Sequence, residues 1–221
     1  MKTLIVGTSY VQGAVGLTTF RMWADMTARL NPAIDLLVVD SASPTFLGGD
    51  PAYNLVRLEN NIGHLSRGGR DGWGRAFTAG LLNAIESGYD WVVHIECDLL
   101  FARPVAEVID KMCRSGVRAA APMAMPYQFI ETALSFWNVA YLKEIDLIRR
   151  YDWENPPAKG LLPEQRIGDI CAGELFALPL RGFRNDMRMN ADQMQRSFPT
   201  GIDWITHCEL PVLKRFAEMQ N

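Results

Sequence analysis

The sequence predicts an α/β fold: a doubly wound, mainly parallel sheet with helices on both faces, which makes a three-layer sandwich. Two observations support this. Short apolar stretches typical of buried strands alternate with longer segments that have helical periodicity. The 221 residues are 48% hydrophobic and 21% charged, as in ordinary globular proteins, so the chain can bury one sizeable core.

The first half of the chain carries the clearest alternation. Pro104 opens one predicted helix, Gly88 suits the end of another, and Asn31-Pro32 stops a third. Strands are expected at 2–7, 36–40, 54–59, 90–95 and 117–121, and helices at about 16–30, from about 73 to 87, and at 105–114.

The second half is less regular. Its loops are rich in Pro or in Arg, Asn, Asp and Met. We expect strands at 133–139 and 174–178, helices at 140–150, 164–172 and 209–219, and loops at 151–163 and 181–206.

Charge and cysteine content narrow the function classes. The 22 Lys and Arg against 25 Asp and Glu give a net charge of −3, so the chain lacks the basic excess of a nonspecific nucleic-acid binder. The four cysteines contain no C-x-x-C pair and predict reduced thiols rather than a zinc or redox centre. No apolar run approaches the ~20 residues of a membrane span, so we expect no transmembrane segment and a cytoplasmic protein.

Polar residues follow three of the predicted strands. Asp40 ends the second strand, Asn61 follows the third, and Glu96 and Asp98 follow the fourth. Ligands of open α/β sheets bind at the carboxyl ends of the strands. Carboxylates at i and i+2 of an extended segment face the same side, and Mg²⁺ or Mn²⁺ prefers such oxygen ligands together with substrate phosphates. Glu96 and Asp98 are therefore candidates to hold a cation and a diphosphate.

A glycine-rich segment, GGRDG at 68–72, precedes the predicted helix that ends near Ser87. Glycines let backbone amides approach a phosphate at a helix N-terminus, and Arg70 and Arg75 would add positive charge. A mobile surface loop is the competing interpretation of this segment.

These motifs together resemble the GT-A glycosyltransferases, most closely the inverting, family 2-like enzymes. The resemblance covers about residues 34–104. It rests on LLVVDSAS, on NNIGHLSRGGRDGWGRAFTAGLLNA, and on WVVHIECDLLF, in which Glu96 replaces the first Asp of the family's D-x-D motif. It implies a single domain over 1–221, with a nucleotide-binding half at 1–121 and an acceptor-binding half at 122–221.

The resemblance also implies roles for individual residues. It implies that a nucleoside-diphosphate sugar and a hydroxyl acceptor are the partners and that Mn²⁺ or Mg²⁺ is the cofactor. Asp40 would read the nucleotide base, and Glu164, or else Asp169, would be the catalytic base that leads to inversion. The implied donor-binding residues are Asp40, Asn61, Arg70, Arg75 and Asp98, and the implied metal ligands are Glu96, Asp98 and His207.

Other interpretations remain open from the residues alone. A nucleotidyltransferase would carry a basic, Gly-rich loop after its first strand, and GTSYVQG at 7–13 lacks a basic residue. A non-catalytic nucleotide-sugar-binding protein and an unrelated flavodoxin-like or Rossmann-like protein are the further alternatives. His94, inside a predicted strand, is expected to be a core histidine, and Trp73 is either a core residue or a sugar-stacking one.

Overall fold

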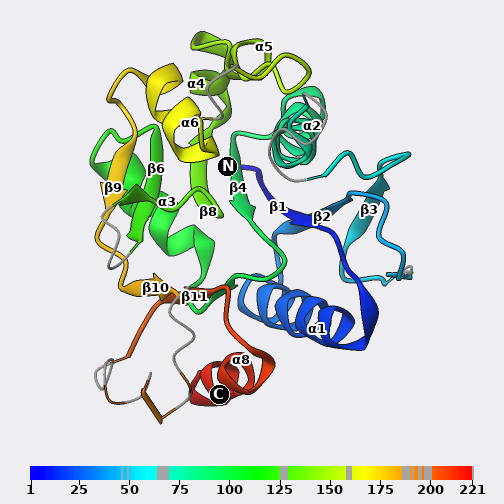
Figure 1. Cartoon of the computed structure of the whole chain (residues 1–221). Coiled ribbons are helices and arrows are strands. Elements are labelled where there is room, and N and C mark those ends of the chain that lie inside the picture. The colour runs from blue at the N-terminus through cyan, green and yellow to red at the C-terminus, as the bar shows by residue number, and fades with distance from the viewer. Residues whose placement is uncertain are drawn as a thin grey trace.

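The computed structural model describes residues 1–45, 47–48, 50–63, 70–124, 129–157, 161–185, 190, 192–193, 196 and 201–220. The strands are β1 (Thr3–Ser9), β2 (Asp35–Asp40), β3 (Asn54–Arg57), β4 (Trp91–Ile95), β5 (Leu100–Phe101), β6 (Ala119–Ala124), β7 (Phe129–Ile130), β8 (Leu134–Asn138), β9 (Phe176–Leu178), β10 (Gly182–Arg184) and β11 (Trp204–Thr206). The helices are α1 (Gly13–Leu30), α2 (Gly72–Glu86), α3 (Val105–Arg114), α4 (Val139–Glu144), α5 (Leu147–Arg150), α6 (Pro163–Cys171) and α8 (Leu210–Met219) (Figure 1).

The main sheet has the strand order β3-β2-β1-β4-β8-β6-β7, and β9 pairs with β6. Strands β1 to β4 are parallel, whereas β8 is antiparallel to both of its neighbours. Ser9 lies opposite Asp40, so the carboxyl ends of β1 and β2 meet at one edge. The predicted mainly parallel sheet is confirmed, with β8 inserted in the opposite direction.

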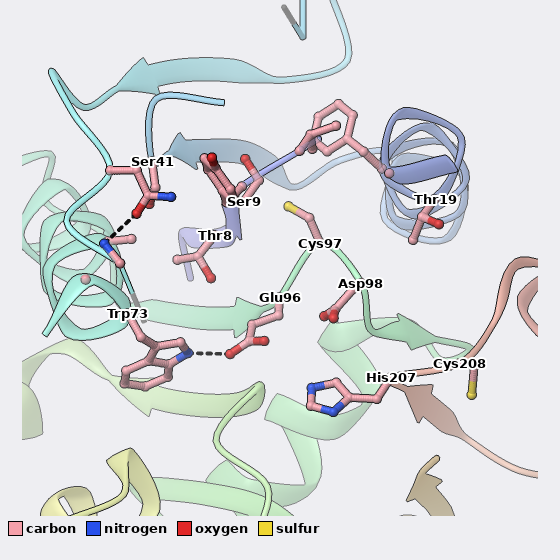
Figure 2. Close-up of a pocket in the computed structure, with 18 residues that line it drawn as sticks. Thr8, Ser9, Thr19, Ser41, Trp73, Glu96, Cys97, Asp98, His207 and Cys208 are labelled. Carbon is pink, nitrogen blue, oxygen red and sulfur yellow. Dashed lines mark hydrogen bonds between the residues drawn. The ribbon is translucent and has the colours of Figure 1, made fainter. Parts of the chain in front are cut away.

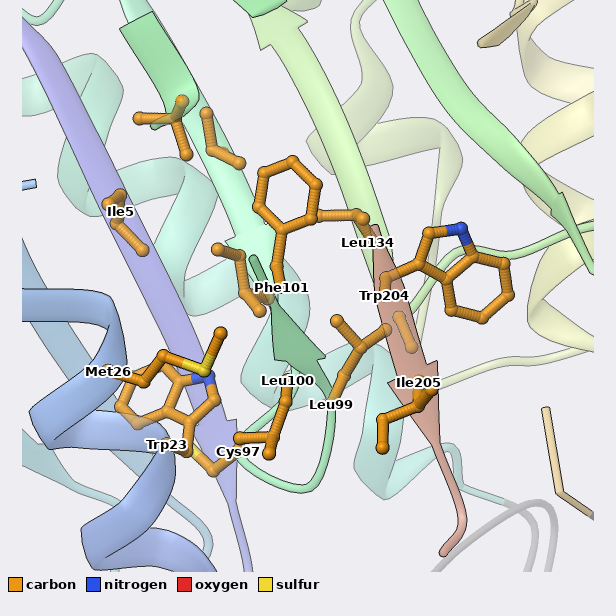
Figure 3. Packing of buried hydrophobic residues seen from close by; sticks show 14 of the residues in the cluster. Ile5, Trp23, Met26, Cys97, Leu99, Leu100, Phe101, Leu134, Trp204 and Ile205 are labelled. Carbon is orange, nitrogen blue, oxygen red and sulfur yellow. The ribbon is translucent and has the colours of Figure 1, made fainter. Parts of the chain in front are cut away.

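Helices cover both faces of this sheet, as predicted (Figure 1). One core cluster joins α1, α3 and α8 to one face, and the other joins α2, α4, α5 and α6 to the opposite face. Strand residues alternate between the two: Ile5 belongs to the first cluster, and Leu4 and Val6 belong to the second. Figure 3 shows the first cluster, where Trp23 and Met26 of α1 lie near Ile5 and Cys97.

Close packing fixes where these elements sit. Gly7 of β1 lets α1 approach, because a Cβ at this position would lie 2.3 Å from the Trp23 ring and 2.8 Å from the Cys97 sulfur. Asp71 caps α2 by accepting a 2.9 Å hydrogen bond from the Gly74 N–H. The start of α2 is therefore held in place beside the carboxyl ends of the strands.

Several features differ from the sequence prediction, among them the short strands β5 and β7, which it did not include. The helix expected at 140–150 is two short helices, α4 and α5, because Asp146 adopts a left-handed conformation with φ of 50°. The loop expected at 181–206 contains β10 and β11, which form a second sheet with β5. The apolar residues of the helix predicted up to about Ser87 also place Leu82 on its buried face, but Leu82 is 41% exposed because that face runs through Phe77 and Leu81.

Within the described part of the chain, no helix combines the length and apolar character needed to span a bilayer. Of the glycine-rich segment, residues 68 and 69 lie outside the described residues. The assignment of nucleotide binding to 1–121 and acceptor binding to 122–221 stays a prediction. The main sheet joins the two parts, since β8 lies between β4 and β6.

Candidate active site

A pocket of about 630 Å³ lies at the carboxyl ends of β1, β2 and β4. This volume falls within the usual range for small-molecule sites. The first turns of α1, the start of α2 and the segment after β11 close the remaining sides (Figure 2). The pocket is lined by Thr8, Ser9, Tyr10, Val11, Gly16, Thr19, Phe20, Ser41, Asn61, Gly63, Gly72, Trp73, Ala76, Glu96, Cys97, Asp98, His207 and Cys208.

Three potential metal ligands meet in this pocket. One ligand atom each from Glu96, Asp98 and His207 can be chosen so that all three lie within 4.8 Å of one another (Figure 2). Asp98 and His207 are exposed, and Glu96 is half-buried. The antiparallel pairing of β5 with β11, with Leu100 opposite Ile205, brings His207 to the acids. The three predicted ligands are thus brought together by the second sheet.

The chemistry of this group fits a divalent cation. Burial raises the pKa of Glu96 well above its ordinary value, and the negative charge of Asp98 raises it further. The positive charge of a bound cation would offset the repulsion between these two carboxylates. Two carboxylates and an imidazole form a donor set suited to Mn²⁺, and Mg²⁺ accepts the two carboxylates equally well.

A second charged cluster, formed by Glu131, Arg184 and Glu164, lies near the first. Glu131 is fully buried, accepts from the Ala133 N–H at 3.1 Å, and pairs with Arg184 at 3.3 Å. Arg184 also lies 3.9 Å from Glu164. Burial raises the pKa of Glu131, while the Arg184 charge lowers it. The negative charge of Glu131 raises the pKa of Glu96 and the positive charge of Arg184 lowers it, so the two clusters interact electrostatically.

Of the two predicted catalytic bases, one lies beside Arg184 in the second charged cluster and the other lies on the exposed surface of α6. Glu164 lies in the first turn of α6, is largely buried, and accepts a 3.4 Å hydrogen bond from the Thr132 hydroxyl. Asp169 is exposed further along α6 and does not line the pocket. Glu164 also lies outside the pocket lining, within the second charged cluster. Of the two, Glu164 is therefore the residue that the fold brings toward the acidic centre.

Asp40 lies behind the pocket wall. Its side chain is fully buried and accepts hydrogen bonds from the hydroxyls of Ser9 and Ser43, and Arg57 lies 3.8 Å away. The role of Asp40 in reading the nucleotide base stays a prediction: its carboxylate is hydrogen-bonded to these neighbours and is not among the lining residues. Ser9 and Ser41 line the pocket in its place.

The predicted phosphate-binding residues are only partly brought together. Asn61 lines the pocket and accepts a 2.7 Å hydrogen bond from the Gly63 N–H. Arg75 instead donates to the Asn60 side chain at 2.7 Å and lies over the Trp153 ring. Arg70 is exposed, and neither arginine is among the lining residues. Their contact with the donor stays a prediction, and in this structure Arg75 is held by Asn60 and Trp153.

His94 is a core histidine, as predicted. It is fully buried, and its Nδ1 lies 3.0 Å from the Thr132 carbonyl oxygen. A carbonyl only accepts, so Nδ1 carries the proton, and Nε2 accepts from the Thr8 hydroxyl at 2.9 Å. Burial lowers the pKa of His94 to about 4, so the ring is neutral at pH 7. His94 thereby joins the pocket wall to the segment carrying Glu131 and Thr132.

Sequence reasoning missed Glu131 and Arg184, and it left the role of Trp73 open. Trp73 lines the pocket and donates its indole N–H to the Glu96 carboxylate (Figure 2). Trp73 immediately follows the glycine-rich segment and so carried a detectable signal. Glu131 and Arg184 carried none, since each lies in a short strand or loop outside any motif.

No family model and no curated protein matches the chain. Solved structures of glycosyltransferases do resemble it. The galactosyltransferase LgtC, in complex with donor and acceptor sugar analogs, has a TM-score of 0.59 at 13% identity over 100% of this chain and 95% of its own.

A glycosyltransferase involved in glycosylation of the major capsid of PBCV-1 has a TM-score of 0.59 at 10% identity, over 100% of this chain and 98% of its own. The glycosyltransferase GlyE of Streptococcus pneumoniae TIGR4 has a TM-score of 0.57 at 9% identity, over 95% of this chain and 54% of its own. The fold of this chain is therefore the GT-A-like α/β fold that these glycosyltransferases share, while the narrower family 2 resemblance stays a prediction.

Proposed function

We propose that the chain is a glycosyltransferase that moves a sugar from a nucleoside-diphosphate donor to an acceptor hydroxyl. The observation that carries the proposal is the convergence of Glu96, Asp98 and His207 in a pocket at the carboxyl ends of the strands. The GT-A-like fold supports it, since the similar structures are those of glycosyltransferases.

In the proposed mechanism, Glu96, Asp98 and His207 hold Mn²⁺ or Mg²⁺. When bound, the cation would offset the charge that develops on the leaving nucleoside diphosphate. Ser9, Ser41 and Asn61 offer hydrogen-bonding groups to the nucleotide, and exposed Tyr10 offers a ring to the base. Asp40 accepts hydrogen bonds from Ser9 and Ser43 and would hold these two residues in place.

The acceptor hydroxyl requires a base, and we assign that role to Glu164. Arg184 lies 3.9 Å from Glu164 and forms an ion pair with its carboxylate, and a general base must lie within reach of the hydroxyl proton that it takes. Glu131 is too deeply buried to reach an acceptor and serves to hold Arg184. Direct displacement assisted by such a base inverts the anomeric centre.

Ligand-induced stabilisation tests the proposal. UDP and GDP with Mn²⁺ should raise the melting temperature, because a ligand at about 100 times its Kd stabilises by about 2.7 kcal/mol. Asp98→Asn should weaken Mn²⁺ binding about tenfold or more, which corresponds to ~1.4 kcal/mol. Asp110→Asn is the matched control, since Asp110 is exposed on α3 and outside the pocket.

Transfer assays with nucleotide sugars then separate the alternatives. Mn²⁺-dependent nucleotide binding without hydrolysis or transfer would indicate a non-catalytic binding protein. Stabilisation by NAD or flavin, without stabilisation by UDP or GDP in the presence of Mn²⁺, would refute the proposal. Unchanged Mn²⁺ affinity in Asp98→Asn would remove Asp98 from the metal site.

A further inference from the structure

We propose that Trp73 is a positioning residue for the metal site: its indole N–H holds the Glu96 carboxylate in the orientation that binds the cation. This inference rests on the proposed function only for the presence of a metal site. Trp73 lies in the first turn of α2, whereas Glu96 follows β4, so the hydrogen bond ties two separate elements together across the pocket (Figure 2).

The Trp73 ring is held from several sides. It stacks on Phe77 with ring centroids 4.8 Å apart, and His94 meets it edge-on at 5.7 Å. Tyr151 packs against it at 6.0 Å. His94 is itself fixed by hydrogen bonds to Thr8 and Thr132. A ring packed in this way presents its N–H in one direction, which is what a positioning donor requires.

The helix turn that carries Trp73 is also anchored. Asp71 is 1% exposed and accepts hydrogen bonds from the Tyr151 hydroxyl and from Arg166 of α6, both at 2.8 Å. Arg166 is 6% exposed, and its guanidinium lies over the Tyr151 ring at 4.0 Å. Because α6 also carries Glu164, this buried cluster joins the helix that orients Glu96 to the helix that carries the proposed base.

Glu96 needs such a partner. The Glu96 ligand atom lies within 4.8 Å of that of Asp98, close enough for the two negative charges to repel each other. Without a fixed donor, the Glu96 carboxylate would turn away from Asp98, and the two acids would no longer face one site. The indole N–H is suited to this task, because it donates, cannot accept, and carries no charge that would compete with a cation. Partners that orient metal ligands in this way typically contribute 10–100-fold to metal affinity.

The test is a titration of the protein with Mn²⁺, in which electron paramagnetic resonance measures the concentration of the free ion. Trp73→Phe keeps a ring against Phe77 but removes the donor, and we expect its Kd for Mn²⁺ to rise about tenfold or more. Trp153→Phe is the matched control: this indole is half-buried outside the pocket, and its substitution should leave the Kd unchanged. Equal Kd values for Trp73→Phe and the unmodified protein would overturn the proposal.

A double-mutant cycle shows whether the effect passes through Glu96. In a Glu96→Gln background, Trp73→Phe should change the Kd by much less than in the unmodified protein, because the carboxylate that it orients is gone. Equal effects in both backgrounds would refute a role acting through Glu96.

The unmodified protein gives an independent measurement if Trp73→Phe does not fold. Of its six indole N–H signals in the NMR spectrum, that of Trp73 should shift most on adding Mg²⁺ and should be among those that Mn²⁺ broadens. Binding of Mn²⁺ with no responding indole would refute the inference but leave the metal site intact. Absence of Mn²⁺ binding in the unmodified protein would refute the metal site of the proposed function itself.

Discussion

His94 should make the stability of the protein depend on pH in a way that the structure specifies. The ring is fully buried, and burial lowers its pKa from 6.5 to about 4. The unfolded chain therefore binds a proton near pH 6.5, but the folded protein does not until about pH 4. Stability is complete above pH 6.5 and is lost as the pH falls toward 4.

The magnitude follows from the difference of about 2.5 pKa units between the two states. At about 1.36 kcal/mol per unit, the full effect is about 3 kcal/mol. Between about pH 7.5 and pH 5, the His94 contribution to the free energy of unfolding should fall by about 2 kcal/mol.

Urea unfolding of the unmodified protein and of His94→Gln measures this contribution. Glutamine does not titrate, and its side-chain amide retains hydrogen-bonding groups near Thr8. Glu96 and Glu131 have raised pKa values and so give the opposite slope, but they are present in both proteins and cancel in the difference. A difference between the two proteins that stays constant from about pH 7.5 to pH 5 would show that His94 is not held neutral by burial.

Two further predictions concern packing and the metal site. Gly74→Ala should destabilise the protein by roughly 1–3 kcal/mol, because its Cβ would lie 2.2 Å from the Tyr151 ring. Gly168→Ala should stabilise the protein by about 0.5–1 kcal/mol, because Gly168 lies inside α6 and no atom lies within 4 Å of the added Cβ. Thermal unfolding of the two variants measures both changes in stability, and equal changes would contradict the packing argument. Mn²⁺ affinity should rise with pH, because the raised pKa of Glu96 lets a proton compete with the cation. Calorimetry in buffers of different ionisation enthalpy should detect the released proton, and a pH-independent affinity without proton release would argue against Glu96 as a ligand.

The sequence by itself determined most of the fold. Short apolar stretches located β1, β2 and β4, and helical periodicity together with Gly88 at the helix end located α2. These are local signals, since strand burial and helix capping depend on neighbouring residues. The same signals placed Glu96 and Asp98 at a strand end, where ligands of such sheets bind.

Only the tertiary structure decided which side chains meet. His207 reaches Asp98 because β11 pairs with β5, and a pairing between two short strands leaves no periodicity to read in the sequence. Asp40 has the expected position in the chain, but its carboxylate is taken up by Ser9 and Ser43. The hydrogen bond from Trp73 to Glu96 likewise depends on how α2 packs on β4, and such distant contacts are set by the packed core rather than by local sequence.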